Sequence, residues 1–339
     1  MSTPTLGACL IVADETACLE NALNSVADHV DEIVVVHTGV RAATVETAAR
    51  YGATIVSAPW QQDFAAARNL ALSFCRSEWV ISLDADETVA ALAGGPFGLR
   101  STLAQLPETV TALAVPIGNS GGPDARGLAG HHELKLCRLG AVRWSGRVHE
   151  RLVTETGSEP EFRLIPAEVL ALVHHGYPDE ETVRAKAARN AELARLQLAD
   201  LEAAGAPPAA YAAALLDLGR SLLGSGRTPA AIECFEGVRA LVRNGGCWLW
   251  ATDFLARIAL GQHRLDAAAG LIRQLSSRGA DTEYCDFLRA QVLAERGELQ
   301  AAASVAAGIS RLTDVGGNVL ASQALDALRA ELAQALHAA

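Results

Sequence analysis

Two aspartates spaced two residues apart, Asp84 and Asp86, carry the strongest chemical signal in the sequence. They stand in LDADET, directly after the apolar segment at 78–83. Two carboxylates at a strand end can both reach one divalent cation, a hard ion that takes oxygen ligands and bridges to phosphate. We assign the cation to Asp86, and to Asp84 either a ribose or a water of the metal shell. Taken alone, the triplet fits a surface turn as well as a metal site. The segments around it are needed to choose between the two.

The segments around this triplet alternate between apolar runs and helical spacing. In chain order we predict a strand at 6–12, a helix at 16–28, a strand at 32–36, a helix at 43–51, a strand at 53–57, a helix at 63–75 and a strand at 78–83. Strands that are apolar throughout and alternate with helices indicate a parallel sheet covered on both faces. Ligands bind at the carboxyl ends of such strands, and the Asp-x-Asp triplet lies at such an end.

The pattern changes further along the chain. Further apolar, strand-like segments are expected at 109–117, 134–138, 147–153 and 168–175, with a polar, glycine-rich loop at 118–132. From Pro178 onward the spacing is helical almost everywhere. We therefore expect an α/β domain over 1–178, a bridging helix over 179–205 and an all-α domain over 206–339.

The helical part contains a repeat of about 35 residues. Its best copy is 215–241, where small and large residues match the spacing of a tetratricopeptide repeat, and 252–275 gives a poorer copy. Gly297, Ala302 and Ile309 repeat the second half of the pattern. Stacked helix pairs of this kind bury a shared core and leave a concave surface. The alternative is a plain helical bundle.

Composition excludes several classes of protein. Half of the 339 residues are hydrophobic and a fifth are charged, which is typical of a packed globular chain. A formal net charge of −11 argues against a general nucleic-acid or anionic-membrane surface. No apolar run reaches the about 18–20 residues of a membrane span, so we expect a cytoplasmic protein. The seven cysteines stand singly, which favours buried, reduced thiols over a zinc site or a disulfide framework.

Ordered motifs make the first 200 residues similar to a known family. They are IVADE at 11–15, DEIVVVHTG at 31–39, YGATIV at 51–56, WQQDFAAARNLAL at 60–72, WVISLDADE at 79–87, LCRLGAVRWSGRVHE at 136–150, HHGY at 174–177 and KAARN at 186–190. They resemble the family 2 glycosyltransferases, and within them a bacterial subgroup with C-terminal tetratricopeptide-like repeats that includes peptide S-glycosyltransferases. The resemblance implies a Rossmann-like GT-A domain that binds a nucleotide sugar, an all-α repeat domain, and a homodimer formed through the helices.

The resemblance also implies donor-binding residues. It puts three residues of the first strand and its turn near the nucleobase and ribose, namely Val12, Asp14 and Glu15. Arg68 and Asn69 are suited to hold donor phosphate or ribose, because a guanidinium grips oxyanions with two hydrogen bonds. Asp63 would order that pair or the base. Lys186 and Arg189 share one helix face and would reach the diphosphate, unless they form an ordinary charged face.

Catalytic groups follow from the same resemblance. Glu150 of GRVHE matches the base that deprotonates the acceptor, and His174 or His175 of HHGY matches a histidine that completes the metal shell. His149 either takes the metal instead or orients Glu150. Inversion at the anomeric carbon needs one in-line nucleophile activated by a base, while Mg²⁺ or Mn²⁺ neutralises the departing diphosphate.

The sequence departs from the family where the nucleobase should bind. His37 replaces the usual Asp at the end of the second strand, and Val40, Arg41 and Ala42 replace a Ser-Thr-Asp turn. A neutral imidazole offers one donor and one acceptor, so a GDP-sugar donor is as compatible with this site as a UDP-sugar donor.

The resemblance implies a thiol or hydroxyl acceptor on a peptide, and a small biosynthetic molecule, such as a low-molecular-weight thiol, is equally compatible with the sequence. The loop 118–132 and the aromatic residues Tyr211, Trp248 and Trp250 are candidates for acceptor contact, with inter-helix packing as the alternative for the tryptophans. A different class of function also fits the chain: a non-catalytic scaffold, in which a degenerate transferase domain supports a peptide-binding helical array.

Overall fold

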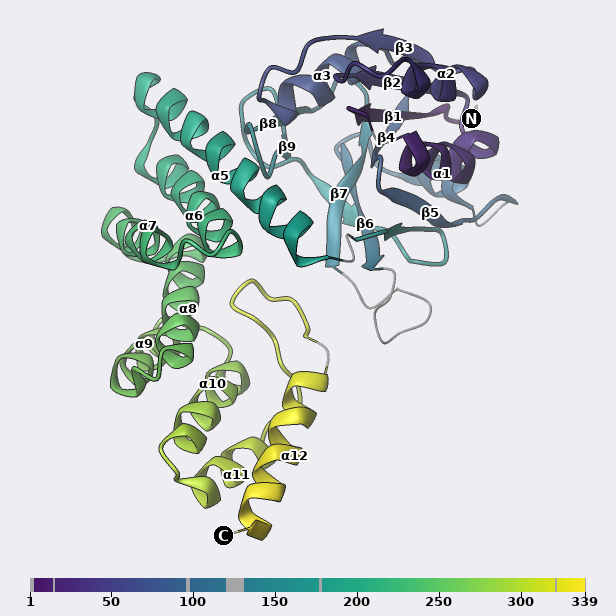
Figure 1. Cartoon of the computed structure of the whole chain (residues 1–339). Helices are drawn as coiled ribbons and strands as arrows, with labels where there is room; N and C mark the ends of the chain where they lie inside the picture. The colour runs from purple at the N-terminus through teal and green to yellow at the C-terminus, as the bar shows by residue number, and fades with distance from the viewer. Residues whose placement is uncertain are drawn as a thin grey trace. The chain divides into compact units, whose positions relative to one another are not determined.

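The chain folds into two compact units, Met1–Asp179 and Glu180–Ala339 (Figure 1). The computed structural model describes residues 3–14, 16–95, 98–119, 131–176, 179–320 and 322–338. Strands and helices alternate in the first part of the first unit, and its later part is mostly strands. The second unit contains helices with one isolated β-bridge among its described residues. The predicted class, an α/β domain followed by an all-α domain, is confirmed. Glu15 and most of the predicted glycine-rich loop, 120–130, fall outside the described residues.

The parallel part of the sheet forms where the sequence predicts it. Its strands, from the edge inward, are β3 (Thr54–Ser57), β2 (Glu32–His37), β1 (Leu6–Val12) and β4 (Trp79–Asp84). Neighbouring strands in this group all pair in parallel. The carboxyl ends of β1, β2 and β4 therefore meet at one edge of the sheet, which brings the turns after these strands together.

Beyond β4 the sheet is mixed, which the apolar pattern did not reveal. The order continues through β7 (His131–Arg138), β6 (Ala112–Asn119), β11 (Leu170–His174) and β5 (Glu87–Leu92), with β10 (Phe162–Leu164) beside β6. β7 runs antiparallel to β4 and to β6, and β5 runs antiparallel to β11. The parallel sheet predicted from the first four strands is confirmed, whereas the direction of the later strands was not predicted, because side-chain alternation reports burial and not strand direction.

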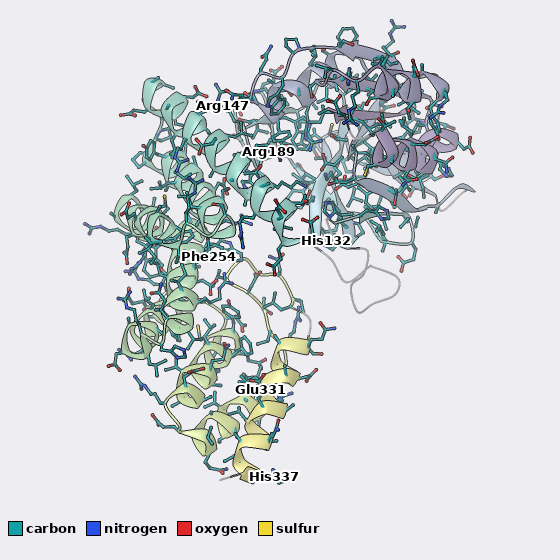
Figure 2. The ribbon with its side chains drawn as sticks, in the orientation of Figure 1. His132, Arg147, Arg189, Phe254, Glu331 and His337 are labelled. Carbon is teal, nitrogen blue, oxygen red and sulfur yellow. The ribbon has the colours of Figure 1, made fainter. Side chains whose placement is uncertain are left out.

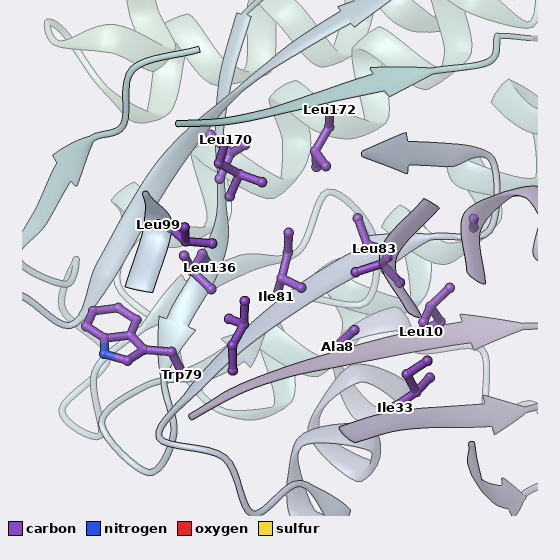
Figure 3. Packing of buried hydrophobic residues seen from close by; sticks show 14 of the residues in the cluster. Ala8, Leu10, Ile33, Trp79, Ile81, Leu83, Leu99, Leu136, Leu170 and Leu172 are labelled. Carbon is purple, nitrogen blue, oxygen red and sulfur yellow. The ribbon is translucent and has the colours of Figure 1, made fainter. Parts of the chain in front are cut away.

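Helices cover both faces of this sheet. α1 (Thr16–Val26) and α4 (Leu99–Gln105) contribute to one apolar cluster, and α3 (Phe64–Phe74) contributes to another. Alternate residues of β1 divide between them: Leu10 belongs to the first and Cys9 to the second. Figure 3 shows the first cluster, with Leu10 beside Leu83. Helix α2 (Ala42–Arg50) follows β2, and a short 3-10 turn (Ala27–His29) follows α1.

A small two-stranded sheet stands apart from the main one. It pairs β8 (Arg143–Ser145) with β9 (Arg151–Val153) in antiparallel register. The strand predicted at 147–153 is therefore shorter than expected, because residues 146–150 form the connection between β8 and β9.

The second unit is a row of helices. They are α5 (Glu180–Ala203), α6 (Pro208–Gly224), α7 (Thr228–Leu241), α8 (Gly246–Gly261), α9 (Leu265–Ser277), α10 (Thr282–Glu295), α11 (Leu299–Ala307) and α12 (Gln323–Ala338). α6 packs on α7, α8 on α9 and α10 on α11. The predicted tetratricopeptide-like repeat is confirmed. Gly219 shows why small residues are needed: a Cβ there would lie 2.6 Å from the Phe235 ring.

The aromatic candidates for acceptor contact belong partly to this helical core. Trp248 is buried, and the guanidinium carbons of Arg239 and Arg278 lie 5.4 and 4.7 Å from its ring centre. Trp250 packs on Phe254 at 5.9 Å between ring centres. Trp248 therefore packs between helices, which was the alternative to acceptor contact.

Two expectations drawn from composition can be compared with the structure. None of the seven cysteines, all of which lie in the described part of the chain, forms a disulfide; five of them are buried, while Cys18 is exposed. Within the part of the chain that the structure describes, no helix has the length and apolarity that crossing a membrane requires.

Candidate active site

The Asp-x-Asp triplet forms the turn between two strands of the sheet. β4 ends at Asp84, Ala85 and Asp86 make the turn, and β5 begins at Glu87. The buried Glu87 carboxylate accepts the Asp84 backbone N–H at 2.9 Å, which closes the turn. The predicted location at a strand end is confirmed.

Pairing of β11 with β5 brings a distant histidine to this turn. His174 lies opposite Glu87 in the register of the two strands, and its Nε2 is 3.3 Å from Oδ2 of Asp86. The backbone N–H of His175 donates to the Asp86 carbonyl at 2.8 Å, while the His175 ring contacts the Thr88 hydroxyl at 2.8 Å. Of the three histidines proposed as metal ligands, His174 is therefore the one whose ring meets the Asp86 carboxylate.

His149 has a different environment. Its side chain is exposed, and its backbone φ of 51° is left-handed, a conformation that is uncommon outside glycine. This backbone turn precedes Glu150, whose carboxylate is largely buried. Both roles given to His149, metal ligand and orienting residue for Glu150, stay predictions.

Asp86 and His174 fit a divalent cation that arrives together with a substrate. Among the described residues, no group of three or more His, Cys, Asp or Glu side chains gathers in a way that could hold a metal ion. Mg²⁺ is usually bound by one or two carboxylates plus substrate phosphates and waters, rather than by a cage of protein ligands. A carboxylate and an imidazole that are 14% and 30% exposed leave room for such phosphate oxygens.

Arg68 contacts both Glu150 and Asp84, two carboxylates that are distant in the sequence. Its guanidinium is buried, and Nε donates to Oε1 of Glu150 at 2.6 Å. Nη1 donates to the Ser82 hydroxyl at 2.9 Å, and Nη2 donates to Oδ1 of Asp84 at 2.6 Å. The guanidinium carbon also lies 4.9 Å from the Trp144 ring centre. These contacts make Arg68 a link between the two carboxylates, and its predicted grip on donor phosphate stays a prediction.

Lys135 is a member of this site that the sequence analysis did not single out. Its Nζ lies 2.8 Å from Oδ2 of Asp84, 3.0 Å from Oε1 of Glu87 and 3.5 Å from Oε2 of Glu133. Lys135 and Glu87 are both buried. The available signal was a lysine within the apolar run ELKLC, next to Leu136, which pairs with Ile81 of β4.

These charges shift the proton equilibria of the carboxylates. Burial by itself would raise the pKa of Asp84, but the charges of Arg68 and Lys135 outweigh it and hold that pKa well below its ordinary value. For Glu87, burial raises the pKa, and the Lys135 charge offsets this only in part. Asp84 is therefore ionised at neutral pH and serves as a counter-ion, not as an acid or base.

Asn69 and Asp63 both form hydrogen bonds with the backbone, one to β8 and the other at the start of α3. The Asn69 amide donates to the Trp144 carbonyl at 2.9 Å and accepts the Trp144 N–H at 2.8 Å, which fixes β8 to α3. Asp63 caps α3 by accepting the Ala66 N–H at 2.8 Å. These contacts do not favour the donor-binding roles predicted for the two residues, which stay predictions.

A second group of predicted residues lies where β1 and β2 end. Val12 is buried and pairs with His37 across the two strands. Oδ1 of Asp14 accepts the N–H groups of Val40 and Arg41 at 3.0 and 2.8 Å, and the Arg41 N–H contributes most to lowering the pKa of Asp14. Nε2 of His37 is buried, lies 3.7 Å from Asp14 Oδ1 and has no hydrogen-bond partner among the described residues. A buried ring nitrogen of this kind is a candidate contact for a ligand.

Lys186 and Arg189 lie on α5, in the second unit. Figure 2 shows the Arg189 side chain on this helix, and its guanidinium contacts Asn190 Oδ1 at 3.1 Å. The contact of Lys186 and Arg189 with a diphosphate stays a prediction.

We expect Arg68→Met to lower the free energy of unfolding by about 3–5 kcal/mol, because it leaves the largely buried Glu150 carboxylate without its cation and Asp84 with Lys135 alone. Urea unfolding monitored by circular dichroism measures this change. Arg50→Met removes the exposed pair with Glu20 and should cost no more than about 1 kcal/mol. Equal effects of the two substitutions would contradict the role given to Arg68.

Comparison with known proteins agrees with this geometry. Residues 8–91 match the family described as Glycosyl transferase family 2. A TPR repeat-containing protein of Synechococcus elongatus is 33% identical, over 50% of this chain and 41% of that protein. The SPbeta prophage-derived glycosyltransferase SunS of Bacillus subtilis is 29% identical, over 56% of this chain and 44% of that protein. The chain thus spans less than half the length of these relatives.

Solved structures with a similar fold include glucosyl-3-phosphoglycerate synthase of Mycobacterium tuberculosis. It has a TM-score of 0.38 and 17% identity, covering 60% of this chain and 81% of that one. The first unit has the α/β architecture that the resemblance to GT-A domains implies, with an acidic turn at the end of β4. Residues 8–91 of this unit are similar to glycosyl transferase family 2, and a tetratricopeptide-like helical unit follows.

Proposed function

We propose that this protein is an inverting, metal-dependent glycosyltransferase that moves a sugar from a nucleoside-diphosphate donor to a thiol or hydroxyl. The observation that carries the proposal is the meeting of three kinds of group at one strand end: the Asp86–His174 pair, the counter-ion Asp84, and Glu150 held by Arg68. The similarity of residues 8–91 to glycosyl transferase family 2 supports the same reaction class.

Asp86 and His174 would hold the cation, Mg²⁺ or Mn²⁺, through an oxygen and a nitrogen. When bound, the cation neutralises the charge that develops on the departing diphosphate. Asp84 does not compete for it in this arrangement, since its two oxygens already accept from Arg68 and Lys135.

Glu150 is the group proposed to take the proton of the acceptor. As the acceptor sulfur or oxygen forms its bond to the anomeric carbon, the bond from that carbon to the phosphate oxygen breaks, and Glu150 accepts the proton released by the acceptor. Arg68 holds one carboxylate oxygen of Glu150 at 2.6 Å, which limits the orientations that the base can adopt.

The nucleobase would bind where β1 and β2 end, and the base is that of UDP or GDP. The unpartnered Nε2 of His37, close to the Asp14 carboxylate, supports a polar contact to the base. For the acceptor, the helical unit and the resemblance to peptide S-glycosyltransferases favour a thiol or hydroxyl on a peptide. A small biosynthetic thiol or alcohol is the other candidate.

Calorimetry of the full chain with Mn²⁺ and a panel of UDP-, GDP- and TDP-sugars tests the proposal. We expect one nucleotide class to bind in the micromolar range, about −8 kcal/mol, and binding to require the cation. If no nucleotide sugar binds, the chain is not a transferase, and the non-catalytic peptide-binding scaffold becomes the better description.

His37→Asp should change which nucleobase is preferred. Substituting an acceptor-only carboxylate for an imidazole removes a donor, so the ratio of UDP to GDP affinity should move by about tenfold, the worth of one hydrogen bond. Calorimetry with both nucleotides measures the ratio. Val40→Ala alters an exposed residue of the same loop and should leave it unchanged. An unaltered ratio in His37→Asp would place base recognition elsewhere.

A further inference from the structure

One ammonium group contacts both ends of the turn that carries Asp86. Lys135 Nζ lies 2.8 Å from Oδ2 of Asp84, the last residue of β4, and 3.0 Å from Oε1 of Glu87, the first residue of β5. Glu87 in turn accepts the Asp84 N–H at 2.9 Å. Lys135 and Glu87 are buried, so water screens their interaction only weakly.

Lys135 approaches from a different strand than the turn it contacts. It belongs to β7, which pairs antiparallel with β4 through Leu136 and Ile81. The turn is thus fixed to the neighbouring strand of the sheet and not only by its own backbone. A contact of this kind removes the freedom that a two-residue turn would otherwise have.

We propose that Lys135 is a positioning residue that clamps the Asp84–Glu87 turn, so that Asp86 faces the cation brought by the donor. The proposal rests on the proposed transferase function. In this proposal Lys135, which is buried, acts through Asp84 and Glu87.

The carboxylates of the turn repel one another, so Lys135 should affect the position of Asp86 as well as the stability of the fold. The turn holds three carboxylates within four residues, Asp84, Asp86 and Glu87. Without Lys135 only Arg68 would offset their charge, from the Asp84 side, and the mutual repulsion of the carboxylates would favour a more open turn. Asp86 lies between the two clamped residues, so any opening displaces it. Residues that support metal ligands in this way typically change metal affinity by about 10–100-fold when they are replaced.

Lys135→Met tests the clamp in the full-length protein. Mn²⁺ affinity, measured by the paramagnetic resonance signal of the free ion in the presence of UDP or GDP, should weaken by about 10–100-fold. Arg138→Met is the matched control, because Arg138 stands on the same strand but pairs with Glu78 outside the site. Its Mn²⁺ affinity should equal that of the wild type.

A double variant distinguishes two effects of losing Lys135: the loss of its hold on the turn, and the buried Glu87 charge that is left unpaired. Lys135→Met/Glu87→Gln removes one buried cation and one buried anion, so it should recover much of the stability lost in Lys135→Met, as followed by urea unfolding. Mn²⁺ affinity should remain weak, since no ammonium group then links Asp84 to residue 87, and Arg68 holds Asp84 alone. Recovery of Mn²⁺ affinity in the double variant, or wild-type affinity in a folded Lys135→Met protein, would overturn the proposal.

Hydrogen exchange provides a readout that does not depend on metal or activity. In the protein without added cation, amides of the Asp84–Thr88 segment should exchange faster in Lys135→Met, while those of β2 keep their wild-type rates. If the wild type binds no Mn²⁺ with either nucleotide, the transferase proposal fails, and faster exchange at the turn would still support the clamp. Unchanged exchange at the turn would reject it.

Discussion

Asp86→Asn should reduce sugar transfer by at least about 10²-fold with every nucleotide sugar, the largest loss expected for a single substitution in this protein. The carboxamide keeps the shape of the side chain but removes the negative charge that holds the cation. A bound cation contributes several kcal/mol of transition-state stabilisation, and each 1.36 kcal/mol corresponds to about a tenfold change in rate. Initial rates over a range of Mn²⁺ concentrations measure the effect.

Two adjacent histidines provide the matched controls for this prediction. His174→Gln should also weaken Mn²⁺ dependence strongly, because the His174 ring meets the Asp86 carboxylate. His175→Gln should have a much smaller effect, since the His175 ring contacts Thr88 instead. Full Mn²⁺-dependent activity in Asp86→Asn, or equal losses in the two histidine variants, would show that the cation binds elsewhere.

Glu150→Gln should slow transfer by about 10²-fold or more, because an amide cannot accept the acceptor proton. The substitution preserves size and leaves an oxygen that can still accept the hydrogen bond from Arg68, so the surrounding contacts should persist. Single-turnover measurements with bound donor separate this chemical step from donor binding. The donor affinity of the variant should equal that of the wild type.

The acceptor class sets the size of this second effect. A thiol ionises in part near neutral pH and depends less on a base than a hydroxyl does. Comparing thiol and hydroxyl acceptors in Glu150→Gln therefore reports on the natural acceptor. Glu155→Gln, at an exposed carboxylate after β9, is the control and should be neutral. Unchanged rates with both acceptors in Glu150→Gln would assign the base role to another group.

Arg68 connects the groups on which these two predictions depend. It donates to Glu150 through Nε and to Asp84 through Nη2. One guanidinium therefore orients the proposed base and also holds Asp84, the first residue of the Asp84–Glu87 turn. Three of its five N–H donors are used in the contacts to Glu150, Ser82 and Asp84. Substitution of Arg68 should consequently affect the donor and acceptor sides of the site together.

The sequence by itself determined the elements and the location of the site. Strands predicted at 6–12, 32–36, 53–57 and 78–83 are β1 to β4, within one residue at each end. Hydrophobic periodicity reads such elements well because burial repeats every two or 3.6 residues along the chain. The Asp-x-Asp triplet at a strand end and the motif GRVHE were visible for the same reason: both are local in sequence.

The tertiary structure alone decided which side chains meet. Asp86 finds His174 only because β5 pairs antiparallel with β11, and Lys135 finds Asp84 and Glu87 only because β7 pairs with β4. Strand order and direction leave no local trace in an apolar run, since side-chain alternation is the same for parallel and antiparallel neighbours. The sequence therefore located the acidic turn, whereas pairing between distant strands selected its partners and revealed Lys135.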